Sequence, residues 1–119
     1  LVIKMEKGLF LISGCAHSGI CNIIEQAIKI TGVNKVYGII GGFHLKLWNN
    51  QAEETLKYIK ALNPEIVMPS HCTELPVLSK FFDEFGIFVQ MILAGICLSV
   101  LLRIKIKNKI KVNFSKKTF

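Results

Sequence analysis

The sequence predicts an α/β fold in which short buried strands alternate with amphipathic helices. Apolar runs rich in Ile and Val alternate with segments whose apolar residues recur every three or four positions. Of the 119 residues 51% are apolar, which suits one packed domain or part of one. This alternation is typical of strand–helix–strand units that build a parallel sheet.

The elements are predicted in order along the chain. Residues 1–13 begin it as a hairpin with its turn at 6–8, since two apolar runs flank Glu6-Lys7-Gly8. A helix over 19–31 starts at Ser18 as N-cap and stops at Gly32. The remaining elements are a strand at 35–40, a helix at 50–62 capped by Asn49 or Asn50, a strand at 65–69 and a helix at 75–85 that stops at Gly86.

The segment after residue 86 is open to two interpretations. Residues 87–102 are predominantly apolar, but 16 residues are fewer than the roughly 20 that a membrane-spanning helix needs. A strand at 87–92 followed by two edge strands around Gly95 is therefore favoured over a membrane anchor. Residues 101–119 form a basic tail in which Lys alternates with Ile or Val, and it is strand-like or loosely ordered.

The positive charge is confined to that tail. The formal net charge is +7, yet seven of the 15 basic residues lie after residue 102, where there is no acidic residue. The rest of the chain carries eight basic and eight acidic residues. The sequence therefore does not predict a nucleic-acid-binding surface.

The four cysteines do not form a recognisable metal-binding or disulfide motif. Cys15, Cys21, Cys72 and Cys97 include no C-x-x-C pair, and no secretory signal opens the sequence, so reduced thiols in a cytoplasmic protein are expected. Cys15 and Cys21 are interpreted as packing residues. For Cys72, a small buried thiol is favoured over a metal ligand.

The three histidines share one context. His17, His44 and His71 each follow a predicted strand, and they are 27 residues apart in both cases. The loops beyond the carboxyl ends of neighbouring parallel strands meet at one edge of a sheet, so the three imidazoles are expected to converge. Neutral imidazole is a common ligand of zinc and related ions. Ser18 and Thr73 lie beside them as candidate substrate contacts, although both fit helix caps better.

Three segments carry a family resemblance. "GCAHSG" (14–19), "IIGGFHL" (39–45) and "MPSHCT" (68–73) resemble, in the same order, segments of the metallo-β-lactamase fold superfamily. The most similar group is the one related to 7,8-dihydropterin-6-methyl-4-(β-D-ribofuranosyl)aminobenzene 5'-phosphate synthase of methanopterin biosynthesis. The resemblance covers residues 1–100. It implies the C-terminal half of an αββα sandwich, with 101–119 as an additional tail.

The resemblance also implies a metal site. By motif, His17 and His71 match metal ligands, whereas His44 stands where most of the superfamily has a bridging aspartate and is a candidate ligand or substrate contact. The implied cofactor is a divalent metal, zinc first, with manganese, iron or magnesium as alternatives. The implied substrate is small and anionic.

One expected motif is missing. The superfamily's principal metal motif, His-x-His-x-Asp-His, does not occur in these 119 residues. We therefore expect a partial domain that is inactive alone and that needs a missing or separately encoded N-terminal half. Two alternatives stay open: a non-catalytic remnant or interaction subunit, and a small membrane-associated protein anchored through residues 87–102.

Overall fold

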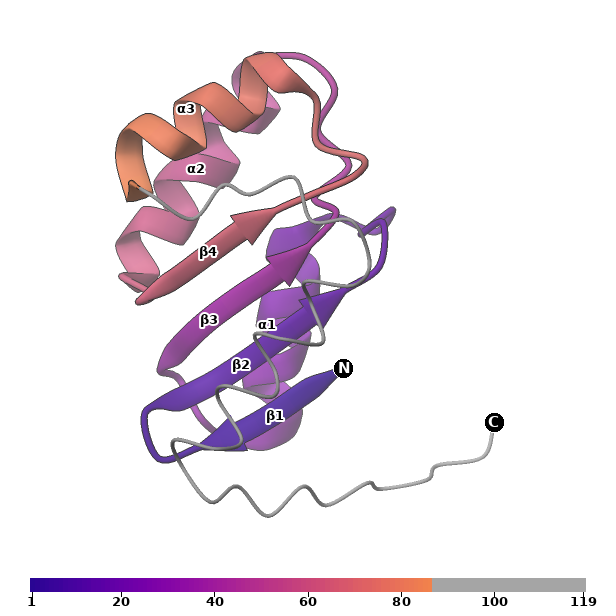
Figure 1. Cartoon of the computed structure of the whole chain (residues 1–119). Helices are drawn as coiled ribbons and strands as arrows, with labels where there is room; N and C mark the ends of the chain where they lie inside the picture. Colours follow the sequence, from indigo (N-terminus) through magenta and orange to yellow (C-terminus); the bar gives the residue numbers. More distant parts are fainter. Residues whose placement is uncertain (87–119) are drawn as a thin grey trace.

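The computed structural model describes residues 1–86 and confirms the predicted α/β class (Figure 1). The element order is a hairpin followed by alternating helices and strands, as predicted. The elements are β1 (Val2–Met5), β2 (Gly8–Ser13), α1 (Ile20–Thr31), β3 (Val36–Gly41), α2 (Asn50–Leu62), β4 (Ile66–Pro69) and α3 (Leu75–Phe85). The predictions for residues 87–119, including the strands, the basic tail and the membrane anchor, lie outside the described residues.

The four strands form one mixed sheet in the order β1-β2-β3-β4. β1 pairs antiparallel with β2 through the predicted hairpin, and β2, β3 and β4 are parallel neighbours. The register between β2 and β3 shifts between Leu9 and Phe10, which is a bulge in the ladder. Because β2, β3 and β4 run in the same direction, the loops that follow them leave from one edge of the sheet (Figure 1).

All three helices pack on one face of the sheet. A single apolar cluster joins strand residues such as Leu11, Ile39 and Val67 to buried residues of each helix, among them Ile24, Ile59 and Phe81. The opposite face carries a second cluster centred on three side chains that are at most 3% exposed, namely Phe10, Ile40 and Met68. The sheet is thus apolar on both faces, as is usual for strands in the interior of an α/β protein.

The helix ends follow from local sequence, with one correction. Gly32 ends α1 in the left-handed conformation, and the Asn49 side chain accepts a hydrogen bond from Ala52 N–H at the start of α2. Ser18 was expected to cap α1, which is wrong: the N-cap is Gly19, at a φ of 90°, and no side chain caps it. Glycine adopts this positive φ readily, so the helix begins one residue later.

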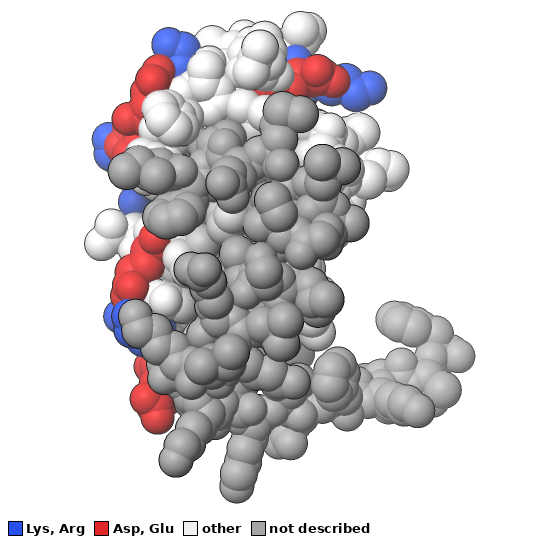
Figure 2. Space-filling view, viewed as in Figure 1, with Lys and Arg blue, Asp and Glu red and all other residues white. Residues whose placement is uncertain are grey.

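Acidic and basic side chains alternate along the margin of the face shown in Figure 2. Ion pairs of the described residues include Lys57 with Glu53, Lys7 with Glu65 and Lys60 with Glu84. In the part of the chain that the structure describes, no helix is long and apolar enough to cross a bilayer.

Candidate metal centre

Backbone hydrogen bonds hold the three strand-end loops together. Gly42 N–H donates to Gly14 O at 2.8 Å, which joins the loop after β3 to the loop after β2. Ser70 N–H donates to Gly41 O at 2.9 Å, which joins the loop after β4 to the end of β3. The three loops are therefore joined through their backbones, but His71 groups with Cys15 and Cys72, and His17 packs on His44, so the three imidazoles do not form one ligand group among the described residues.

The loop after β4 places His71 against two thiols. Cys15 Sγ lies 3.1 Å from His71 Nε2, and the ligand atoms of Cys15, His71 and Cys72 all lie within 4.8 Å of one another. On the other side of the ring, Ser70 Oγ lies 3.2 Å from Nδ1. Ser70 therefore engages Nδ1 and leaves Nε2 facing the thiols, an arrangement in which an outer-shell partner orients a ligand.

The other two histidines pair with each other. The imidazole rings of His17 and His44 have centroids 4.5 Å apart and planes inclined by 56°, and both side chains are exposed. Left-handed backbone positions the two later histidines, with φ of 54° at His44 and 22° at His71. Such conformations are uncommon for residues other than glycine and are concentrated at functional loops.

The glycine at position 42 makes room for the His71 cluster. A Cβ at Gly42 would lie 2.3 Å from Cys72 Sγ and 2.6 Å from His71 Cε1, well inside van der Waals contact. No other residue type fits there without displacing both side chains. At Gly14, by contrast, a Cβ would meet no atom within 4 Å. The second glycine of "GGFH" is therefore needed for close packing of the cluster.

The thiol of Cys72 is held in its neutral form. Burial raises the pKa of Cys72, and the neighbouring Cys15 thiol raises it further, while a backbone hydrogen bond at His44 acts in the opposite direction. Its Sγ lies 3.5 Å from the Cys15 carbonyl oxygen, to which the thiol donates. The Cys72 thiol thus donates to the backbone of the loop after β2.

The donor set suits a borderline-soft divalent ion. Zinc binds thiolate sulfur at about 2.3 Å and imidazole nitrogen at about 2.0–2.1 Å, so two such ligands lie roughly 3.5–3.8 Å apart around a tetrahedral ion. The separations of 3.1 Å and at most 4.8 Å in the cluster bracket that spacing. The residues present therefore fit zinc better than magnesium, which prefers oxygen ligands.

Several predicted roles need correction. Cys15 is exposed and faces His71, so its interpretation as a packing residue is wrong, and Cys72 is only half-buried rather than a core thiol. Cys21 does pack against the main core cluster. The clue that would have found the two thiols is their position: each lies in a strand-end loop, Cys15 two residues before His17 and Cys72 directly after His71.

Ser18 and Thr73 have different surroundings. Ser18 is exposed, and its backbone oxygen accepts a hydrogen bond from the Asn22 side chain at 2.6 Å. Thr73 is 3% exposed, and its Oγ1 accepts a hydrogen bond from Phe43 N–H at 3.0 Å. Thr73 is not the cap of α3, because that position belongs to Glu74. Its hydroxyl instead ties the loop of His44 to the loop of His71.

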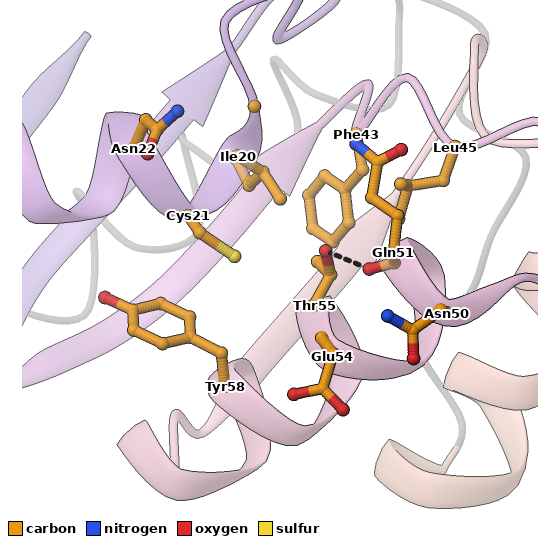
Figure 3. A pocket seen from close by; sticks show the side chains of 11 residues that line it. Ile20, Cys21, Asn22, Phe43, Leu45, Asn50, Gln51, Glu54, Thr55 and Tyr58 are labelled. Atoms are coloured by element: carbon orange, nitrogen blue, oxygen red, sulfur yellow. Dashed lines mark hydrogen bonds between the residues drawn. The ribbon is translucent and has the colours of Figure 1, made fainter.

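A pocket of about 470 Å³ lies between α1, α2 and the loop after β3 (Figure 3). Its wall combines apolar side chains, among them Ile20, Phe43 and Leu45, with polar ones, among them Asn22 and Glu54. None of the three histidines lines it, although Phe43 and Leu45 flank His44 in the sequence. The pocket is therefore a neighbour of the candidate metal centre rather than part of it.

Comparison with curated proteins finds two relatives in Methanocaldococcus jannaschii. One is 7,8-dihydropterin-6-methyl-4-(beta-D-ribofuranosyl)-aminobenzene-5'-phosphate synthase, 41% identical over 96 residues, which are 80% of this chain and 33% of the synthase. The other is an uncharacterized protein, 40% identical over 77 residues, or 64% of this chain and 28% of that protein. The chain thus spans about a third of the length of the curated relatives it matches.

A solved structure gives the same result for the fold. A metal-dependent hydrolase of the β-lactamase superfamily matches with a TM-score of 0.63 and 31% identity, over 77% of this chain and 35% of that one. No family model matches the sequence. The resemblance seen in the three loop motifs is confirmed: the chain is a homologue of the dihydropterin synthase and shares part of the fold of a metallo-β-lactamase superfamily hydrolase.

Proposed function

We propose that the chain contributes part of the metal centre of a metal-dependent enzyme related to the methanopterin-pathway synthase. The observation that carries the proposal is the 41% identity to that synthase, in a chain whose three histidines all follow neighbouring parallel strands. His17 and His71 hold the metal, and His44, whose ring packs on that of His17, is a further ligand or contacts the substrate. A bound divalent metal, with zinc as the first choice, would polarise a phosphate oxygen of the substrate.

The loops around the site suit a small anionic substrate. Residues 13–19, 41–49 and 70–73 contain no Asp or Glu, and Lys46 lies in the middle segment. In the synthase reaction that the homology suggests, a dihydropterin diphosphate is joined to ribofuranosylaminobenzene phosphate and diphosphate is released. A related phosphoester hydrolysis is the second candidate, because the structural relative is described as a hydrolase. The free thiols of Cys15, Cys21 and Cys72 favour a reducing compartment, the cytoplasm.

We further propose that the remaining ligands come from polypeptide outside these 119 residues. A catalytic metal takes about three protein ligands and keeps one position open. The relatives are about three times as long as the matched region, which leaves room for a segment bearing His-x-His-x-Asp-His. Such a segment would precede this chain in one polypeptide or be encoded separately.

Reconstitution tests the proposal. The full chain is combined with the part of the M. jannaschii synthase that lies outside the matched region, and diphosphate release is followed with the two synthase substrates and Zn²⁺. We expect turnover only when both polypeptides are present, and its loss in His17→Ala and His71→Ala. Phosphodiester hydrolysis without condensation would favour the hydrolase. An assembled pair that binds zinc but has neither activity would overturn both enzymatic roles.

A further inference from the structure

We propose that Cys15 and Cys72 are themselves metal ligands and that, with His71, they form a Cys₂His site for a thiophilic divalent ion. The proposal deepens the proposed function, because it shares His71 with that metal centre, but it predicts sulfur ligands where the motif comparison predicts only histidine. Cys15 is 56 positions from His71 and 57 from Cys72 in the sequence, yet the three side chains are adjacent in space.

The geometry supports a common ligand set. The three ligand atoms lie within 4.8 Å of one another without any displacement of the backbone. The nitrogen that faces the thiols is Nε2, because Nδ1 already contacts Ser70 Oγ. An ion placed between the three atoms would replace the Cys15–His71 contact with two bonds to the same ion.

The surroundings hold the two thiols at this spacing. Gly42 packs so closely on Cys72 Sγ and His71 that a methyl group there would displace them. The Gly42 N–H bond to Gly14 O fixes the residue next to Cys15, and Cys72 Sγ contacts the Cys15 carbonyl. The cluster is therefore held in place by contacts between loops that are far apart in the sequence.

The chemistry balances without a further reactant. On binding, each thiol releases its proton to the buffer, and the two thiolates with neutral imidazole cancel the charge of a divalent ion. Three ligands leave a fourth position open, as in catalytic zinc sites with a Cys₂His donor set. Cys15 and His71 are exposed, so an ion can reach the site from solvent.

Cobalt titration tests the proposal, since thiolate-to-cobalt charge transfer in the near ultraviolet reports sulfur ligands directly. The full-length chain is reduced with a phosphine and titrated anaerobically with Co²⁺, and zinc affinity is then measured by displacement. A Cys97→Ser background removes the fourth thiol. We expect a charge-transfer band that weakens stepwise in Cys15→Ser and Cys72→Ser and disappears in the double variant. Cys21→Ser is the matched control, because that thiol lies in the pocket and outside the cluster.

The outcomes separate this proposal from the proposed function. Each ligand substitution should weaken zinc binding by more than the roughly 10–100-fold that loss of an outer-shell partner costs. Cobalt binding without a charge-transfer band, abolished by His17→Ala and His71→Ala, would overturn the thiolate site and leave the histidine centre intact. A Cys15–Cys72 disulfide that persists in the reduced preparation would also overturn it. A folded Cys15→Ser/Cys72→Ser double variant that keeps the full charge-transfer band would likewise overturn the thiolate site.

Discussion

Cys15 Sγ lies 3.1 Å from Nε2 of His71, although the loops after β2 and β4 that carry them are separated by a whole strand of the sheet. The contact is possible because β3, which lies between them, ends in two glycines. Gly42 contributes only backbone at the point where the side chains of the outer loops meet. The strand order and one missing Cβ together create the cluster.

Gly42→Ala tests this relationship. Its Cβ would lie 2.3 Å from Cys72 Sγ, so we expect Cys72 and His71 to turn away and the metal affinity to fall sharply. Both displaced groups are side chains, so the fold should survive with a loss of about 1–3 kcal/mol in the free energy of unfolding. Cobalt titration and urea unfolding measure the two effects.

Gly14→Ala is the control for that experiment, since a Cβ there meets no atom within 4 Å. Gly14 belongs to the same group of loops, so a general effect of stiffening these loops would appear in both variants. If Gly42→Ala binds cobalt as the unaltered chain does, the close packing on His71 has no role in the site.

Ser70→Ala tests the orientation of His71. The serine is buried, and its hydroxyl contacts Nδ1 at 3.2 Å. Its removal frees the imidazole to change tautomer or rotate, so we expect zinc affinity to fall about 10–100-fold with little change in stability. Competition with a chromophoric chelator measures the affinity. Ser79→Ala removes a hydroxyl bonded within α3 and should leave the zinc affinity unchanged.

The sequence was sufficient to predict the described elements, because each is specified locally. The apolar positions of α1 and α3, the left-handed glycine at 32 and the Asn49 cap all act within a few residues. The cap of α1 was misassigned because Ser18 and Gly19 are adjacent, and only the backbone conformation decides between them.

The site was predicted less completely for a physical reason. Strand adjacency places three loops at one edge, which is why the histidines could be grouped from sequence. Which ring meets which partner depends instead on the left-handed φ values at His44 and His71 and on contacts across loops. These determine that His17 pairs with His44 and His71 with Cys15, and neither pairing is encoded in spacing.

Thr73→Val tests the link between the loops of His44 and His71. The buried hydroxyl accepts the Phe43 N–H, and valine keeps the shape while leaving that donor without its partner. We expect a loss of about 1–3 kcal/mol in the free energy of unfolding. Hydrogen exchange at the Phe43 amide should accelerate, whereas Thr73→Ser, which keeps the hydroxyl, should preserve the protection. Equal exchange in both variants would mean that the backbone alone holds this loop.

Tyr58 and Glu25 give a prediction about pH. Tyr58 Oη donates to the Glu25 carboxylate and so joins α2 to α1. Burial, and after it this hydrogen bond, raises the pKa of Tyr58 well above the ordinary value of about 10. As the pH rises, Tyr58 therefore ionises in the unfolded chain before it ionises in the folded chain. The pair therefore makes its full contribution to the free energy of unfolding below about pH 10. That contribution is lost as the pH rises from there through the pKa of Tyr58 in the folded chain.

Tyr58→Phe should accordingly lower the free energy of unfolding by about 1 kcal/mol near neutral pH, and the difference from the unaltered chain should shrink above about pH 10. Urea unfolding followed by circular dichroism at several pH values gives this difference, in which the lysine titrations common to both chains cancel. Tyr37→Phe is the matched control, because the contacts recorded for Tyr37 with Phe10 and Lys7 involve its ring, which phenylalanine retains. A Tyr58→Phe difference that stays constant from neutral pH to above pH 10 would show that the hydroxyl does not link the two helices in solution.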